Sequence, residues 1–234
     1  MTTKIYKNAY EATKDITSHS RIMSGGFGLC GIPENSIDAI AKLKIRDLTV
    51  ISNNIGNSGR GLVTLLRKKM ISKAICSYIG GNPDLEEQLF KKEVDVELVP
   101  QGTFAERIRA AGLGIRAFYT PTGYGTLIAE GKEVKSFDVP CLLETALHAD
   151  FAIIKAQKAD PYGNLWFKET ARNFSPLMAM AAKITIVEVE ELLDLGELLP
   201  EDIHLPGIFV QRLFKGINYN NDIEFLKLED EGAP

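Results

Sequence analysis

The sequence has no long apolar run and no paired cysteine motif. No segment approaches the roughly 18 apolar residues that a membrane-spanning helix needs. The three cysteines, Cys30, Cys76 and Cys141, are scattered, which argues against a disulfide framework or a zinc site. The amino-terminal stretch lacks the apolar core of a signal peptide. We therefore expect a soluble, cytoplasmic protein that neither enters a membrane nor holds a metal.

Strong charge of either sign is also absent. The 234 residues include 27 basic and 31 acidic side chains, a formal net charge of −4. Nucleic-acid-binding proteins usually carry a basic face, so this balance argues against a nucleic-acid partner. The hydrophobic fraction of 45% is that of an ordinary globular domain. Because no linker or internal repeat is visible, we predict a single domain over residues 1–234.

Apolar runs alternate with helical patterns through the first half of the chain. The runs are typical of buried strands and lie at residues 21–24, 48–52, 74–78 and 94–99. The segments between them have apolar residues at helical spacing and lie at residues 36–43, 61–70 and 84–92. This repetition predicts an α/β fold, namely an open, mainly parallel sheet with helices on both faces.

The second half has a less regular pattern, in which glycine and proline interrupt the apolar runs. The expected elements are a long loop at residues 112–126, a hairpin ending at Pro140, a strand at 151–156, a turn at 160–163, a returning strand at 165–167, a helix at 175–182 and a last strand at 184–189.

A glycine-rich segment, Gly26-Phe27-Gly28-Leu29-Cys30-Gly31, follows the first predicted strand and precedes a helix. Glycines at this position permit a tight turn and a close approach of a ligand, and helix amides favour an anion. A dinucleotide site would also need an acidic residue at the end of the second strand, where this sequence has Asn53-Asn54. The segment is therefore either a simple strand–helix turn or a loop around a small acyl ligand, with a nicotinamide cofactor least favoured.

Amide side chains follow the second and fourth predicted strands. Asn53 and Asn54 end the second strand, and Gln101 follows the fourth. The carboxyl ends of parallel strands meet at one edge, where open α/β sheets bind their ligands. An amide can donate a hydrogen bond to a carboxylate or thioester oxygen without adding charge. We therefore predict an uncharged polar site formed by these amides with Gly25, Gly26 and Gly28.

Other polar groups favour structural roles over chemistry. Thr103, with Glu106 three residues later, has the pattern of a capping box at a helix start. Glu188, Glu190 and Glu191 suit a charged segment where a strand leaves the sheet. We expect neither a metal site nor a catalytic triad, because the histidines lack partners at suitable spacing.

Five blocks of sequence occur in a recognisable order. They are residues 24–33 (SGGFGLCGIP), 52–54 (SNN), 100–103 (PQGT), 119–126 (YTPTGYGT), and 163–165 (GNL) with 171–174 (ARNF). Together they resemble the A-type subunit of the family I coenzyme A transferases. The first two blocks, with IHLPGI at residues 203–208, are most similar to the succinyl-CoA:3-oxoacid branch.

The resemblance implies a ping-pong transfer of CoA from succinyl-CoA to a 3-oxoacid such as acetoacetate. CoA is then a substrate, and no metal or prosthetic group is required. In that family a glutamate nucleophile in a Ser-Glu-Asn-Gly context belongs to a separate B-type subunit. No glutamate of this chain precedes Asn-Gly, so we expect no catalytic nucleophile here and an α2β2 assembly with B-type chains.

The resemblance also implies roles for the site residues. Gln101 would orient a carboxylate or thioester oxygen, Asn53 and Asn54 would help to bind the CoA or acyl part, and the loop at residues 25–28 would shape the site. An acetate- or butyrate-acetoacetate transferase is an alternative, because pockets separate such acids by only ~1–3 kcal/mol. A nucleotide-binding oxidoreductase and a small-effector sensor are more distant alternatives.

Overall fold

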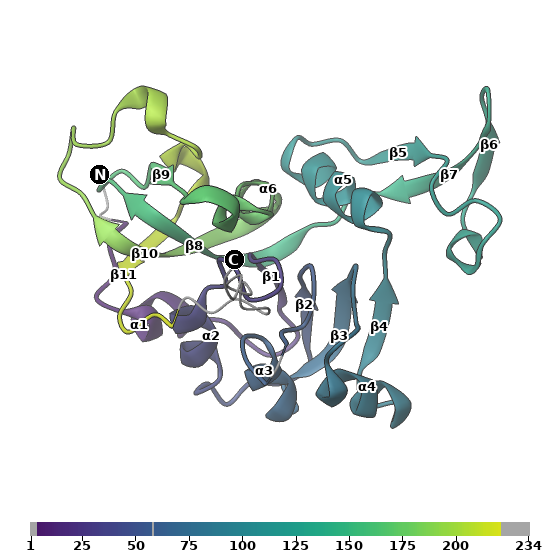
Figure 1. Ribbon diagram of the computed structural model, residues 1–234, viewed down its shortest axis with the longest axis horizontal. Helices are drawn as coiled ribbons and strands as arrows, with labels where there is room; N and C mark the ends of the chain where they lie inside the picture. The colour runs from purple at the N-terminus through teal and green to yellow at the C-terminus, as the bar shows by residue number, and fades with distance from the viewer. Residues whose placement is uncertain (1–3, 58, 221–234) are drawn as a thin grey trace, which may run out of the picture.

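Parallel strands form the main sheet of the molecule (Figure 1). The computed structural model describes residues 4–57 and 59–220. The strands follow the order β11-β10-β8-β1-β2-β3-β4 with parallel pairing throughout, and the short β9 pairs antiparallel with β8. Their bounds are β1 (Arg21–Ser24), β2 (Leu48–Ile51), β3 (Ile71–Cys76), β4 (Asp95–Leu98), β8 (Ala149–Ala159), β9 (Leu165–Trp166), β10 (Ala182–Leu192) and β11 (Arg212–Lys215).

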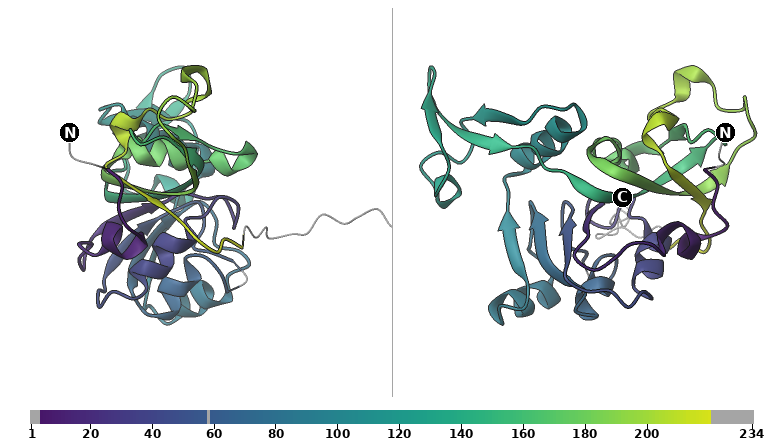
Figure 2. Two further views of the ribbon diagram at one scale, coloured as in Figure 1. Left: turned by 90° about the vertical axis from the view of Figure 1, so that its left-hand side faces the viewer. Right: turned by 180° about the vertical axis from the view of Figure 1, so that it is seen from behind.

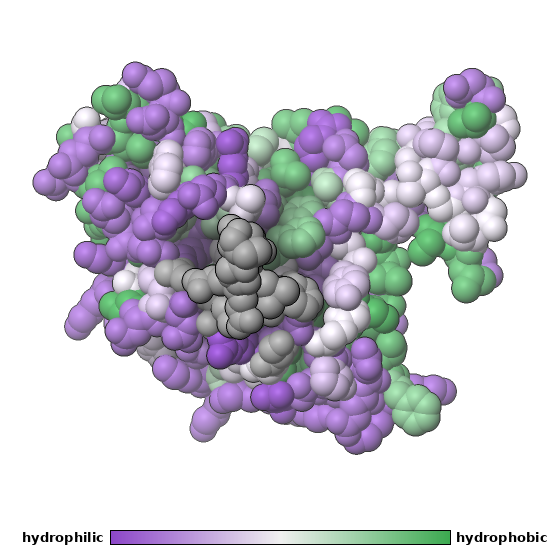
Figure 3. Space-filling model, viewed as in Figure 1, coloured by the Kyte–Doolittle hydropathy of each residue, from purple (hydrophilic) through white to green (hydrophobic). Residues whose placement is uncertain are grey.

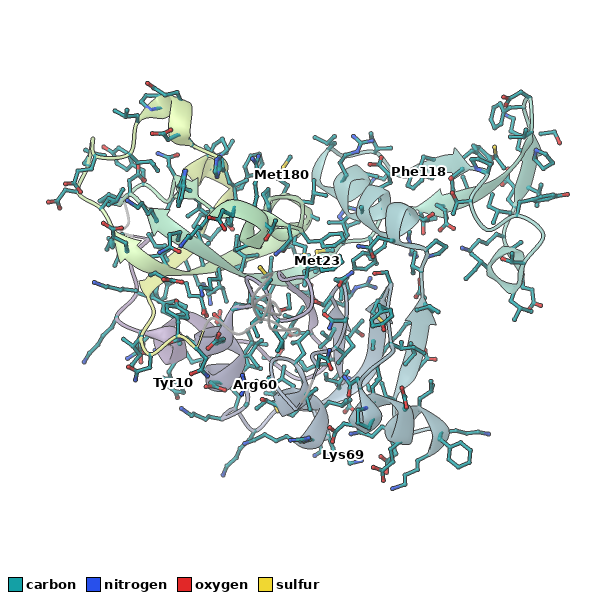
Figure 4. All side chains as sticks on the ribbon, viewed as in Figure 1. Tyr10, Met23, Arg60, Lys69, Phe118 and Met180 are labelled. Atoms are coloured by element: carbon teal, nitrogen blue, oxygen red, sulfur yellow. The ribbon has the colours of Figure 1, made fainter. Side chains whose placement is uncertain are left out.

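Helices cover both faces of this sheet, as predicted. Alternate residues of one strand point to opposite faces, so Ile22 joins a core beneath α1 to α4, whereas Met23 joins a core beneath α5 and α6 (Figures 1 and 4). Phe104 of α5 packs edge-on against Phe174 at the start of α6, with ring centroids 5.4 Å apart. The helix bounds are α1 (Ala9–Thr13), α2 (Glu34–Ile40), α3 (Val63–Arg67), α4 (Pro83–Phe90), α5 (Gln101–Gly112) and α6 (Ser175–Ala181).

A second, smaller sheet projects from the body of the molecule (Figures 1 and 2). It is antiparallel, has the order β5-β7-β6, and consists of β5 (Ala117–Thr120), β6 (Val134–Ser136) and β7 (Pro140–Thr145). Apolar side chains remain exposed on this part, including Leu127, Val134 and Phe137. Figure 3 shows green atoms among pale ones on the projecting part.

Most predicted elements are confirmed, and two predictions were wrong. The loop expected at residues 112–126 contains β5, whose short, partly exposed strand has no strong apolar pattern. The strand expected to be last is followed by β11, which adds a parallel edge to the sheet. The single-domain prediction includes residues 1–3, 58 and 221–234, which lie outside the described residues, and it stays a prediction. No described helix is long and apolar enough to cross a membrane.

Candidate active site

Two of the predicted amides meet at the carboxyl edge of the sheet. The buried Asn53 follows β2, and its Nδ2 donates hydrogen bonds to Gln101 Oε1 at 3.0 Å and to Ser77 Oγ at 2.9 Å. The Ser77 hydroxyl also contacts Gln101 Oε1 in a short hydrogen bond. Since these residues follow β2, β3 and β4, one polar network joins the ends of three neighbouring strands.

Gln101 is the first residue of α5, and its position gives the network an outward-facing donor. Its Oε1 accepts from both Asn53 and Ser77, so the Nε2 of this exposed residue remains to donate to a ligand. The amides of the first helical turn have no acceptor within the helix, and the helix dipole favours negative charge at this end. This corner of the molecule can therefore stabilise a developing negative charge on a substrate oxygen.

The capping box predicted at Thr103 and Glu106 was wrong. The helix begins three residues earlier, with Pro100 in the cap position and no side-chain cap. Thr103 lies inside the first turn and is buried, and Glu106 pairs instead with Arg109 on the surface. Pro100 sets this boundary because its own backbone is extended and its ring disfavours a helical conformation at the preceding residue.

The glycine loop begins at the same edge, one strand away from Asn53. Ser52 Oγ donates to Ser24 O at 2.9 Å, which ties the end of β2 to the end of β1. Gly25 N then donates to Ile153 O of β8, and Gly26 turns the chain with a φ of +115°. Gly25, Gly26 and Gly28 are buried, as is Asn54 beside Asn53. The structure thus places all six predicted residues along one edge, while their binding roles stay predictions.

Ser77 is the member of the network that sequence reasoning missed. It follows β3 as Asn53 follows β2 and Gln101 follows β4. The predicted third strand extended to residue 78, which placed Ser77 within the strand and away from its end. A strand boundary shorter by two residues would have identified it.

A cavity of about 260 Å³ lies on the other side of the glycine loop. Leu29 and Cys30 line it on the loop side, and Lys155, Gln157 and Glu190 line it on the sheet side. These polar side chains bind one another: Lys155 Nζ lies 2.8 Å from Glu190 Oε1, and Gln157 Nε2 donates to Glu190 Oε2. Asn53 and Gln101 do not line this cavity, so the amide network lies outside it, with Asn53 buried and Gln101 exposed.

Glu188 is wholly buried in β10, and the prediction that it belongs to a charged segment leaving the sheet was wrong for this residue. Its carboxylate accepts hydrogen bonds from Asn35 N at 3.2 Å and from Ser36 N and Oγ, both at 2.7 Å. Burial raises the pKa of Glu188 to about 7, against the opposing effect of these donors and of Lys155. Glu188 therefore anchors the start of α2, the helix that follows the glycine loop.

His204 and the Asp150 carboxylate, both weighed as parts of a site, have structural partners. His204 Nδ1 accepts from Phe167 N at 3.0 Å, and its ring stacks beside Trp166. Asp150, near His148, accepts from Arg21 N and pairs with Lys183. Among the described residues, no group of three His, Cys, Asp or Glu side chains is arranged to hold a metal ion.

Comparisons with known proteins give a consistent result. A family model described as coenzyme A transferase matches residues 6–216. The A-type subunit of the Helicobacter pylori succinyl-CoA:3-ketoacid coenzyme A transferase is 52% identical over 94% of this chain and 96% of its own length. The human mitochondrial succinyl-CoA:3-ketoacid coenzyme A transferase 2 is 46% identical over 98% of this chain, which spans only 49% of the human protein.

The fold is similar to that of solved acyl-CoA transferases. The crystal structure of an Escherichia coli O157:H7 acyl-CoA transferase apoenzyme superposes with a TM-score of 0.84 at 21% sequence identity. The match covers 92% of this chain and 47% of the Escherichia coli chain. The chain thus spans about half the length of that protein, as it does for the human relative.

Proposed function

Because this chain belongs to the coenzyme A transferase family, we propose that it is the A-type subunit of an enzyme that moves CoA from succinyl-CoA to a 3-oxoacid such as acetoacetate. The observation that carries the proposal is the difference in how much of each relative's length this chain matches. The chain accounts for nearly all of the Helicobacter pylori A-type subunit, but for only half of the human relative. A second chain, the counterpart of the remaining half, would complete the enzyme.

The catalytic nucleophile would come from that B-type partner. Its glutamate attacks the thioester carbonyl of succinyl-CoA, and the CoA thiolate leaves as a mixed anhydride forms. The thiolate then attacks the glutamyl carbonyl of the anhydride, which gives an enzyme-CoA thioester and releases succinate. The acceptor carboxylate takes CoA by the reverse sequence, so one difficult exchange is divided into easier covalent steps. CoA is the substrate throughout, and no metal or prosthetic group takes part.

The residues of this chain would bind and orient the reacting groups. Gln101 Nε2 donates to the substrate oxygen on which negative charge develops, and the start of α5 adds its dipole. Asn53 holds Gln101 in place, and Asn54 with the 25–28 loop contacts the acyl or CoA part. The exposure of Gln101 supports a composite site, since a thioester there needs a second wall that excludes water.

The assembly we propose contains two copies of each chain in the cytoplasm. An acetate- or butyrate-acetoacetate transferase would use the same residues and differ only in the shape of the acyl pocket. Assays with these acids as acceptors separate the alternatives without changing the mechanism.

The Gln101→Ala substitution is expected to lower kcat of the assembled enzyme about 10- to 100-fold, because it removes one donor to the developing charge. Stability should change little, since Gln101 is exposed. Steady-state kinetics and thermal unfolding of the purified pair measure both effects. Glu106→Ala, on the exposed surface of the same helix, serves as the control and should leave both unchanged. Unchanged turnover in Gln101→Ala would contradict the assignment.

A further inference from the structure

One asparagine side chain holds both limbs of the glycine loop. Asn173 Oδ1 accepts a hydrogen bond from Gly26 N at 3.0 Å, where the loop leaves β1. Asn173 Nδ2 donates to Cys30 O at 3.1 Å, where the loop returns toward α2. The two loop residues are thus joined through a single amide group that lies far from them in the sequence.

The turn between these two residues is closed by its own backbone. Phe27 N donates to Cys30 O at 3.1 Å, and Cys30 N donates to Phe27 O at 3.0 Å. Because the ends of the turn are bonded to each other, holding Gly26 and Cys30 holds the whole turn. The two contacts of Asn173 therefore hold the turn as a unit against the segment that precedes α6.

Asn173 makes these contacts from an unusual backbone conformation. It follows a 3₁₀ helix at Glu169–Arg172 and has φ 24° and ψ −121°, a region that side-chain-bearing residues seldom adopt. Its Oδ1 also accepts from Phe174 N at 2.7 Å, and its Nδ2 donates to Ala171 O at 3.1 Å. Such conformations persist only where the surroundings enforce them, and they concentrate at functional sites.

The loop also approaches this segment too closely for a side chain. A Cβ atom on Gly31 would lie 2.6 Å from Ala171 O and 3.0 Å from Asn173 Nδ2. Gly31 and Asn173 therefore pack against each other where the loop meets the segment that leads into α6.

We propose that Asn173 is a positioning residue for CoA transfer, holding the glycine loop against the segment that leads into α6. The loop and the strand edge that carries Asn53 and Gln101 are connected through Ser24 O and Ser52 Oγ, so a displaced loop changes the wall of the substrate site. This role rests on the proposed function. Asn173 acts through the loop backbone, because both the oxygen and the nitrogen of its side-chain amide bind backbone groups of the loop.

Asn173→Gly is the informative substitution, because glycine accepts the unusual backbone conformation while removing both contacts. Asn218→Gly is the matched control, since Asn218 also has a positive φ, 52°, and is exposed. In the co-purified enzyme, Asn173→Gly is expected to lower kcat about tenfold or more, with a much smaller change in KM for succinyl-CoA. Asn173→Asp keeps the acceptor for Gly26 N and loses the donor to Cys30 O. Its kcat should fall between that of the wild type and that of Asn173→Gly.

Amide hydrogen exchange of the loop peptide separates positioning from simple loss of fold. We expect exchange at residues 26–30 to accelerate about tenfold in Asn173→Gly, while core strands retain their protection. Asn218→Gly should match the wild type in both measurements. Wild-type loop exchange and wild-type kcat in Asn173→Gly would overturn the proposal. A wild-type enzyme that fails to transfer CoA would instead refute the proposed function, and the exchange result would still decide whether Asn173 holds the loop.

Discussion

Replacing Gly31 with alanine is expected to destabilise the chain by about 3 kcal/mol. Gly31 has a φ of +71°, and an added Cβ would lie 2.6 Å from Ala171 O and 3.0 Å from Ala171 Cα. These are backbone atoms, so the clash cannot be relieved by rotation of a side chain. Relief requires the loop to move away from the segment before α6, which should also lower activity. Denaturant-induced unfolding measures the free-energy change.

Gly114→Ala is the matched control for this substitution. Gly114 has a similar φ, +75°, but a Cβ there would meet no atom within 4 Å. Its expected cost is only the ~1 kcal/mol of the left-handed backbone conformation, so the difference between the two variants isolates the close contact. Equal losses in the two variants would contradict close packing of the loop.

Glu188 is expected to make stability depend on pH in the neutral range. Its pKa is raised to about 7 in the folded chain, first by burial, with Ser36, Asn35 and Lys155 acting in the opposite direction. In the unfolded chain it has an ordinary carboxyl pKa, so folding takes up a proton between roughly pH 4.5 and 7. The contribution of the protonated carboxyl group to the free energy of unfolding is fully present below this pH window. It is lost as the pH rises through the window. The expected loss is about 3 kcal/mol.

Glu188→Gln removes the titration while keeping the size of the side chain. The variant loses one acceptor for the donors of Asn35 and Ser36, so it should be less stable than the wild type at pH 5. That disadvantage should shrink by about 2–3 kcal/mol by pH 8, because the wild type then carries a buried charge. Glu191→Gln, at an exposed position of the same strand, should show a constant difference. A wild-type-like pH profile in Glu188→Gln would contradict the assignment.

The carboxyl-edge site was predictable because parallel strands share one edge. Asn53 and Gln101 are 48 residues apart, yet each lies just beyond the end of a strand whose apolar run is clear in the sequence. The start of α5 was not predicted, because the capping pattern at Thr103 competed with the boundary that Pro100 sets. Local patterns identify which elements exist more securely than where they begin.

Contacts that depend on tertiary packing were beyond the sequence. Asn173 and Gly26 are 147 residues apart, and no periodicity or spacing relates them. Glu188 resembled its charged neighbours in sequence, but in the fold it lies under the start of α2. Of the small sheet, only the hairpin near Pro140 was expected; β5 was missed, since it is short and only half-buried and so lacks the alternation that predicts a strand.

The central claim is that this chain forms half of a composite active site and receives its nucleophile from a partner. CoA transfer from succinyl-CoA to acetoacetate should be measured with the chain alone and with the chain co-purified with its B-type partner. We expect only background transfer from the isolated chain and clear activity from the pair. Comparable activity from the isolated chain would show that it carries its own nucleophile, and would contradict the account.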